Sequence, residues 1–92
     1  MSTSLDQLAR GLRVLNKIAV AHRSARDPGS NGVGVTVSLR CRGPQYVVSV
    51  EHYRDDGGYG EKLSRTEKSF DTLDAAVEHV GQQGFSIEQL SF

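Results

Sequence analysis

The strongest constraint on the fold is a strict alternation of apolar and polar residues that occurs twice in the middle of the chain. In GVGVTVSLRC, residues 32–41, a valine, leucine or cysteine fills every second position. A second alternating run covers residues 46–52, after a turn sequence at 42–45 that contains glycine and proline. This alternation is typical of half-buried strands, and the short connection predicts an antiparallel hairpin. The register that places apolar side chains opposite one another pairs Cys41 with Tyr46, Leu39 with Val48, and Val37 with Val50.

The residues before this hairpin carry apolar side chains at spacings of three and four, which predicts a helix. The stripe consists of Leu5, Leu8, Leu12, Leu15, Ala19 and His22. Ser4 is the expected N-cap, because its hydroxyl can accept a hydrogen bond from an amide of the first turn. We expect the helix to end before Pro28, since the residue that precedes a proline disfavours the helical region.

The chain reverses a second time at residues 55–58, where two aspartates and two glycines form a turn sequence. Beyond it we expect a third strand that extends to about Lys68 and, being polar, lies at an edge of the sheet. Folding at this turn pairs Leu63 with Val50 and Lys62 with Glu51.

A second helix is predicted to follow, with Asp71 as its N-cap and Gly81 or Gly84 at its end. Its apolar stripe consists of Leu73, Ala76, Val77 and Val80. Residues 85–92, FSIEQLSF, predict a short last strand. The fold class is therefore α+β, with the order α-β-β-β-α-β and an antiparallel sheet that carries both helices on one face. The predicted core contains Leu12, Leu15, Val37, Leu39, Val48, Val50 and Val77.

The length of 92 residues predicts one domain, residues 1–92, with room for one modest core. No apolar run approaches the roughly 18 residues of a membrane span, so we expect no membrane partner. The N-terminal MSTSLDQL lacks the pattern of a signal peptide. Cys41 is the single cysteine, which is typical of a reducing compartment. These features predict a cytoplasmic protein.

The residues that could carry chemistry form no recognisable catalytic or metal-binding pattern. The glycines of GSNGVG, residues 29–34, follow a predicted helix and open a strand, which is the reverse of a dinucleotide-binding loop. Cys41 faces inward without a neighbouring base, and the three histidines lack the spacing of zinc ligands. We therefore expect no enzyme, no catalytic residue, no metal, no cofactor and no small-molecule substrate.

The charge of the chain is balanced, with 11 basic and 11 acidic residues, but it is unevenly distributed. Residues 1–50 hold seven basic and two acidic residues, a net charge of +5, whereas residues 51–92 hold four and nine, a net charge of −5. On the predicted helix, Arg10, Arg13 and Lys17 lie opposite the apolar stripe. These cations form either a binding face or an ordinary solvated surface. We predict an anion-binding surface formed by Arg10, Arg13, Lys17, Arg23, Arg26, Arg40 and Arg42.

The chain as a whole, from STSLDQLARGLRVLNKIAVAHRSAR at residues 2–26 to SFDTLDAAVEHV at residues 69–80, resembles the small phage-encoded anti-CRISPR proteins. Within that group it is most similar to inhibitors of the type I-F CRISPR surveillance complex. The resemblance implies a non-enzymatic inhibitor that binds the guide-RNA-loaded complex in the bacterial host cell and blocks hybridisation of target DNA. Its partners would be subunits of the complex and the guide RNA. These inhibitors share no common motif, so the resemblance assigns no residue a role.

Two other functions remain open at this point. The order α-β-β-β-α is similar to the double-stranded-RNA-binding domain, which would make the chain a small RNA-binding module. The second helix, DTLDAAVEHVGQQ, lacks the lysines with which that domain contacts phosphates. A sheet that binds RNA needs exposed aromatic residues, and the outward side here offers Tyr53 with Thr36, Ser38, Ser49 and Ser64. A phage structural or assembly protein is the third alternative.

Overall fold

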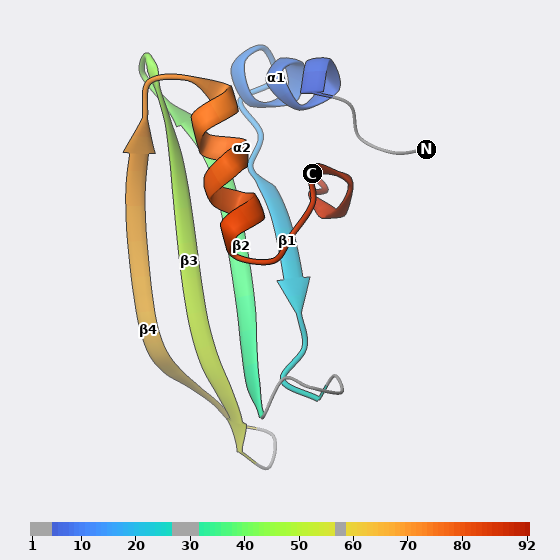
Figure 1. Cartoon of the computed structure of the whole chain (residues 1–92), viewed down its shortest axis with the longest axis vertical. Coiled ribbons are helices and arrows are strands. Elements are labelled where there is room, and N and C mark those ends of the chain that lie inside the picture. The colour runs from blue at the N-terminus through green and yellow to red at the C-terminus, as the bar shows by residue number, and fades with distance from the viewer. Residues whose placement is uncertain (1–4, 27–31, 57–58) are drawn as a thin grey trace.

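The predicted hairpin forms the centre of the fold. In the computed structural model of the protein, which describes residues 5–26, 32–56 and 59–92, β2 (Val33–Arg42) and β3 (Gln45–Asp56) form an antiparallel pair (Figure 1). All three predicted pairs are present, so the register is confirmed. Gly43 in the turn has a φ of 59°, a left-handed conformation that glycine adopts without strain.

The first helix is shorter than predicted, and its expected second half is a strand. α1 covers Leu5–Arg13, and β1 covers Ala19–Arg23 and pairs antiparallel with β2. Between them Asn16 has a φ of 51°, a left-handed value that ends the helix. In β1 the buried Ala19 and Ala21 alternate with exposed residues, so a period of two replaces the helical period. The prediction of one continuous helix is wrong.

The early end of α1 also removes Leu15 from the predicted core. Leu15 is 56% exposed, because it lies in the connection to β1 instead of on a buried helix face. Five of the other predicted core residues are at most 1% exposed: Leu12, Val37, Leu39, Val48 and Val50. Val77 is partly buried and packs against this cluster.

The third predicted strand is β4 (Tyr59–Phe70), which lies at an edge of the sheet as expected. Its predicted register is wrong: Val50 pairs with Thr66 instead of Leu63, and Lys62 pairs with Tyr53 instead of Glu51. Strand pairing continues to Asp56 and Tyr59, so the two aspartates of the expected turn belong to β3, and its two glycines, residues 57 and 58, lie outside the described residues. A bulge between the pairs His52–Ser64 and Tyr53–Lys62 leaves one extra residue in β4. The pairs on the His52 side of this bulge are therefore one residue further from the predicted register than the pairs next to the turn.

The second helix agrees with the prediction in its apolar stripe. α2 covers Leu73–Gln82, with Ala76 and Val80 buried and the other two stripe residues packed against the core. Its N-cap is Thr72, one residue after the expected Asp71. The Thr72 hydroxyl accepts a hydrogen bond of 3.2 Å from a backbone amide of the first turn, which fixes the start of the helix.

A short helical turn replaces the predicted last strand. η1 covers Ile87–Gln89, and the Gln89 side chain accepts a hydrogen bond of 2.7 Å from the backbone N–H of Ser86, which winds the segment. Beyond η1, Ser91 forms an isolated bridge to Val20 of β1, while Phe85 and Leu90 are buried in the core cluster. The order of helices and strands in the described residues is therefore α-β-β-β-β-α, which is still an α+β fold.

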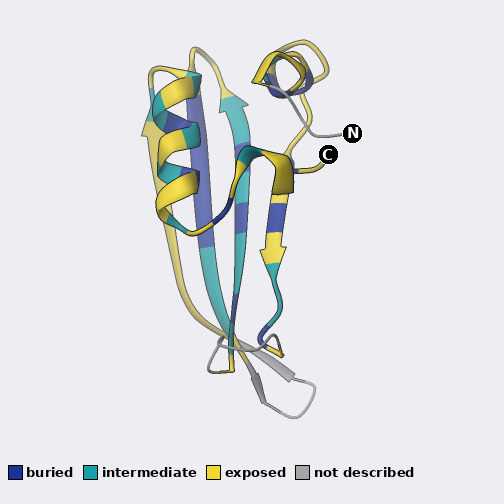
Figure 2. Cartoon of the chain, turned by 45° about the vertical axis from the view of Figure 1, so that its right-hand side comes forward, coloured by how far each residue is buried: buried dark blue, intermediate teal, exposed yellow. Residues whose placement is uncertain are grey.

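Both helices lie on one face of the sheet, as predicted (Figure 1). The strand order in the sheet is β1-β2-β3-β4. One buried cluster contains Leu8 and Leu12 of α1, Ala76 and Val80 of α2, and inward residues of the strands. Figure 2 shows a continuous buried stretch in the strand beside α2 and exposed residues along the outer side of the helix. Among the described residues, no helix covers the opposite face of the sheet.

Candidate partner-binding face of the sheet

The face of the sheet opposite the helices is built from alternate residues of the strands, and we call it the outer face. Neighbours in a strand point to opposite sides, so Leu39 enters the core while Arg40 points outward. The outer face consists of Val20 and His22 on β1, Thr36, Ser38, Arg40 and Arg42 on β2, Val47, Ser49, Glu51 and Tyr53 on β3, and Lys62, Arg65, Glu67 and Ser69 on β4. Residues from both halves of the chain meet here, so the charge separation seen in the sequence is mixed by the fold.

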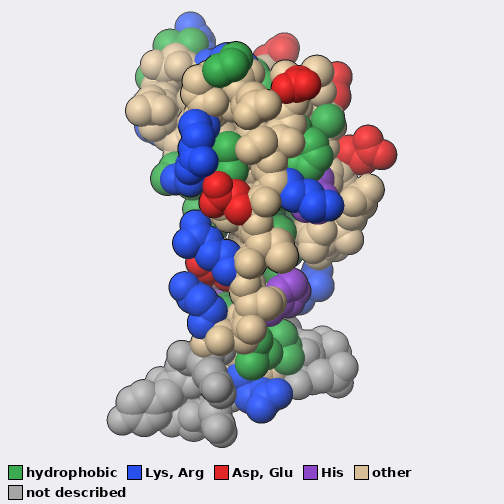
Figure 3. Space-filling view, turned by 90° about the vertical axis from the view of Figure 1, so that its left-hand side faces the viewer, with side chains coloured by type: hydrophobic (Ala, Val, Ile, Leu, Met, Phe, Trp, Pro, Cys, Tyr) green, Lys and Arg blue, Asp and Glu red, His purple; other side chains and the backbone are tan. Residues whose placement is uncertain are grey.

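Four cations and two acids on this face form a connected set of ion pairs, which we call the ion-pair ladder. Glu67 lies 3.8 Å from Arg40, 3.4 Å from Arg42 and 3.6 Å from Arg65. Glu51 lies 3.5 Å from Lys62 and 3.6 Å from Arg65. Figure 3, which faces the β4 edge, shows lysine and arginine side chains following one another along one side with acids among them. Four cations against two acids leave a net charge of +2.

The ladder contributes little to stability compared with the core. Its side chains are 33% to 63% exposed, and an exposed ion pair contributes about 0.2–1 kcal/mol. The charges also discourage the β4 edge from pairing with another strand. The excess positive charge remains accessible to an anionic partner.

Arg40 is the most enclosed cation of the ladder. Its side chain is 35% exposed, and its Nε atom is buried without a hydrogen-bond partner. Beneath the ladder, Val47 is 0% exposed although it belongs to the outer face, so the charged side chains themselves cover the sheet. A buried N–H without a partner costs free energy. The Arg40 Nε is enclosed by the fold, and the contact of 3.8 Å with Glu67 is made by a terminal guanidinium nitrogen, which is the part of the side chain that a partner could reach.

Two aromatic rings lie beside the ladder, and we call His22 and Tyr53 the ring stack. Their planes are parallel within 5° and their centroids are 5.7 Å apart, an offset stack. The Tyr53 hydroxyl lies 2.8 Å from Nε2 of His22, whose Nδ1 lies 3.0 Å from the Thr36 hydroxyl. Tyr53 lies against Gly34, where an added Cβ would be 2.2 Å from the ring carbon Cζ. Glycine at this position is what allows the ring to approach the sheet.

Two of the predicted partner-binding residues are held by contacts on the helix side. Nε of Arg13 donates a hydrogen bond of 2.5 Å to the Tyr46 hydroxyl, and its guanidinium lies 4.6 Å from the centre of that ring. This hydrogen bond raises the pKa of Arg13. Arg23 donates a hydrogen bond of 3.0 Å to the Gly84 carbonyl and lies over the ring of Phe85. Both arginines connect elements of the fold.

The predicted basic helix face is not formed. Lys17 lies beyond the end of α1, so it cannot share a helix face with the arginines of that helix. Arg10 and Lys17 are exposed, and Arg26 follows β1, where its backbone N–H donates to a serine hydroxyl. Of the seven predicted residues, Arg40 and Arg42 belong to the outer face, and the other five do not join them on it.

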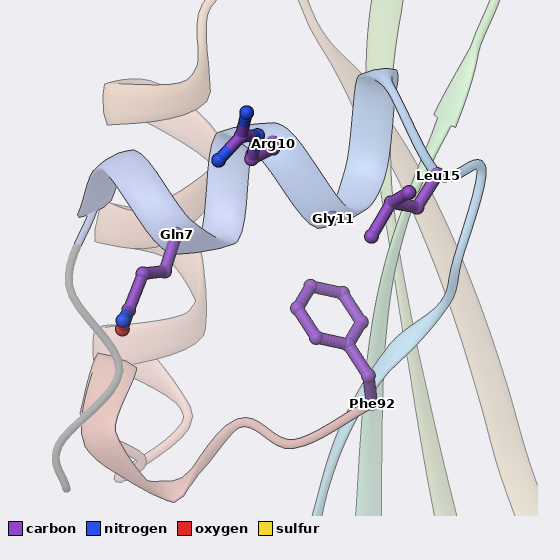
Figure 4. A pocket seen from close by; sticks show the side chains of 5 residues that line it. All are labelled: Gln7, Arg10, Gly11, Leu15 and Phe92. Atoms are coloured by element: carbon purple, nitrogen blue, oxygen red, sulfur yellow. The ribbon is translucent and has the colours of Figure 1, made fainter.

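A shallow pocket of about 320 Å³ lies between α1 and the C-terminal residue (Figure 4). It is lined by Gln7, Arg10, Gly11, Leu15 and Phe92. The Phe92 ring lies close to Gly11, where an added Cβ would be 2.2 Å from the ring. Arg10 brings a single cation to an otherwise uncharged lining, so the pocket lacks the several convergent polar groups that fix a small ligand.

The remaining chemistry-bearing residues give no metal centre in the described part of the chain. No group of three or more His, Cys, Asp or Glu side chains there is arranged to hold a metal ion. Burial raises the pKa of the Cys41 thiol, which disfavours the reactive thiolate. No helix in residues 5–26, 32–56 or 59–92 is long and apolar enough to span a membrane.

The β4 half of the ion-pair ladder and the His22 half of the ring stack could not be recognised from the sequence. Arg65 and Glu67 face outward with Arg40 only in the observed β3–β4 register, which differs from the predicted one. His22 was assigned to a helix. Tyr53 was correctly expected on the outward side, whereas Ser64 pairs with His52 and belongs to the helix side.

No protein-family model matches the chain, and no curated protein or solved structure matches it either. The interpretation of the outer face therefore depends on its own geometry and charge.

Proposed function

We propose that this protein is a non-enzymatic phage anti-CRISPR inhibitor that binds the guide-RNA-loaded type I-F surveillance complex in the cytoplasm of the bacterial host. The outer face docks on the complex and keeps target DNA from hybridising to the guide. Its partners are subunits of the complex and the guide RNA. The observation that carries the proposal is the ion-pair ladder, in which four exposed or half-exposed cations face two acids and leave a net charge of +2.

The spacing of the ladder suits a row of negative charges. Arg40 and Arg42 are two residues apart on one face of a strand, which separates their Cα atoms by about 7 Å. Arg65 lies on β4, two strands away, which adds about 10 Å across the sheet. Three guanidinium groups at such distances can each contact a different phosphate or carboxylate, and arginine forms bidentate hydrogen bonds with both.

The acids of the ladder hold these cations in position until a partner replaces them. Glu67 contacts three arginines, so a phosphate or a partner carboxylate that displaces it gains contacts with several cations at once. Each phosphate contact releases counterions, so the affinity for a nucleic-acid partner should fall as salt concentration rises.

The test is co-purification with the loaded surveillance complex, using two charge-reversed variants. Arg40→Glu with Arg42→Glu changes the outer face, and Arg10→Glu with Lys17→Glu makes the same charge change elsewhere on the surface. We expect the first variant to lose binding and the second to bind like the wild type, with both folded by circular dichroism. The reverse result would assign docking to the N-terminal cations. Failure of the wild-type protein to bind the loaded complex would refute the proposed function.

A free RNA-binding module is the second candidate, and the ring stack on an open sheet is the observation that favours it. The same pull-down separates the two functions. An inhibitor should co-purify with the surveillance complex and its guide, whereas an RNA-binding module should bring down heterogeneous RNA. Nuclease treatment then distinguishes an RNA contact, which is lost, from a contact with an acidic protein surface, which persists.

A further inference from the structure

We infer that the ring stack of His22 and Tyr53 is a stacking site for one unpaired nucleobase of single-stranded RNA. The inference deepens the proposed function and rests on it for the source of that RNA, which is the guide. It depends on three features of the structure: the parallel rings, the exposure of His22 and the cations beside Tyr53.

The two rings already have the geometry that a nucleobase would extend. They are parallel within 5°, and Gly34 lets Tyr53 lie close to the sheet. His22 is exposed, and the contact with the Thr36 hydroxyl restrains its ring. A base that stacks on this pair needs little side-chain ordering, which lowers the cost of binding.

Positive charge lies on β4, the strand next to Tyr53. Lys62 is the β4 partner of Tyr53, and Arg65 is the β4 partner of Glu51, one row further along the sheet. Adjacent strands lie about 4.8 Å apart, so both cations lie one strand from Tyr53 and three strands, about 14 Å, from His22 on β1. A single strand that runs across the sheet from His22 toward β4 can place the phosphates of its neighbouring nucleotides near these cations. Aromatic rings beside a positively charged surface are the features with which proteins bind single strands without sequence preference.

The arrangement favours single strands over duplexes. Bases in a duplex are stacked on one another and do not present a free face, whereas unpaired bases do. The ring stack offers a planar surface with few directional groups, since the hydroxyls of Tyr53 and Thr36 are both directed to His22. We therefore expect tolerance of base identity.

The alternative is a purely structural role, in which the ring stack only connects β1 to β3. Two variants of His22 separate the two roles. His22→Phe keeps an aromatic ring but cannot hydrogen-bond Thr36 or Tyr53, whereas His22→Ala removes both the ring and the hydrogen bonds. A structural role makes both variants less stable to a similar degree, and a stacking role makes them differ in RNA binding.

The experiment measures the fluorescence anisotropy of a labelled 12-nucleotide single-stranded RNA of mixed sequence at low salt. Inorganic polyphosphate, an anion without bases, is the control, and its affinity is measured by its competition with the labelled RNA. Removing one stacking ring should weaken RNA binding by about five- to one-hundred-fold in His22→Ala. His22→Phe should bind within about threefold of the wild type, and polyphosphate should bind all three proteins equally. Gly34→Ala, which displaces the Tyr53 ring, should resemble His22→Ala.

Three results would overturn the inference: no RNA binding by the wild type, equal RNA binding by His22→Ala and the wild type, or equal losses for RNA and polyphosphate. These measurements use the isolated protein, so they do not depend on the surveillance complex. If the RNA results hold but the loaded complex is not bound, the proposed function fails and the inference stands. If the complex is inhibited but His22→Ala binds RNA like the wild type, the proposed function stands and the inference of a nucleobase site fails.

Discussion

The two faces of the sheet are built from the same strands but perform different tasks. On the helix side Leu39 is 0% exposed and lies in a cluster closed by α1 and α2. Its neighbour Arg40 faces the other side, where its partner is a charged residue and no helix of the described chain covers it. A period of two thus allows one strand to supply stability on one face and a charged surface on the other.

The separation between the faces is not complete. Val47 is 0% exposed and Ser49 is 6% exposed although both belong to the outer face. Val47 pairs with Arg40 and Ser49 pairs with Glu67, and the aliphatic stems of such long side chains can cover neighbouring surface. The outer face is therefore a thin layer of charge over a buried strand, so charge changes there should alter binding much more than stability.

The largest effect on stability should come from the helix side. Leu39→Ala should lower the free energy of unfolding by about 2–5 kcal/mol, because it removes a fully buried side chain from a packed core. Ser38→Ala, one residue away on the outer face, should change it by no more than about 0.5 kcal/mol. Urea denaturation of both variants measures the difference. Equal midpoints would show that the two faces do not divide their tasks as described.

The sequence predicts those parts of the fold in which pattern and turn chemistry agree. The β2–β3 register follows from alternation on both sides of Gly43, and the α2 stripe follows from a helical period in a segment of the right length. β1 could not be found in this way, because its five residues continue the spacing of three and four that begins in α1. The deciding feature is the left-handed turn at Asn16, where the chain leaves the helix to add a strand beside β2.

The candidate site was predictable only where it lies within one hairpin. Alternation places Arg40 and Arg42 outward, and both were identified as binding residues. Their partner Glu67 depends on the β3–β4 register, which an irregularity beside Tyr53 displaces. The basic residues of α1 and β1 were predicted to form one surface. Arg13 is instead held by its hydrogen bond to the Tyr46 hydroxyl, a contact between distant parts of the chain that the order of charges in the sequence does not reveal.

The next largest effect should come from the turn that follows α2 on the helix side. Gly84 has a φ of 89°, and an added Cβ would lie 3.1 Å from the Arg23 guanidinium. Gly84→Ala should therefore cost about 1–2 kcal/mol. Gly81→Ala is the matched control, because nothing lies within 4 Å of an added Cβ and alanine favours helix. Thermal denaturation that shows no difference between the two variants would contradict this explanation.

On the outer face we expect a substitution that slightly lowers stability but raises affinity for the partner. Glu67→Gln removes the acid that contacts three arginines, and it should lower stability by no more than about 1 kcal/mol because the pairs are exposed. It raises the net charge of the ladder, so affinity for the loaded surveillance complex should increase several-fold at low salt. Glu78→Gln makes the same charge change on α2, away from the ladder, and should leave affinity unchanged. A loss of affinity in Glu67→Gln alone would contradict this prediction and show that binding needs the acid, either to position the arginines or to contact the partner.

The smallest effect concerns Cys41, a half-buried thiol on the helix side. Burial raises its pKa, and the nearby Arg13 only partly opposes this change. A thiol whose pKa is higher in the folded than in the unfolded state contributes stability that is present below the ordinary thiol pKa and is lost as pH rises through the folded value. Stability of the wild type should therefore decline more between pH 7 and pH 10 than that of Cys41→Ser, in urea titrations of both proteins.

Inhibition of the surveillance complex should be unchanged in Cys41→Ser, because the thiol lies on the face opposite the ladder. Parallel pH profiles would show that the thiol titrates alike in both states, and loss of inhibition in a folded variant would extend the functional surface to the helix side.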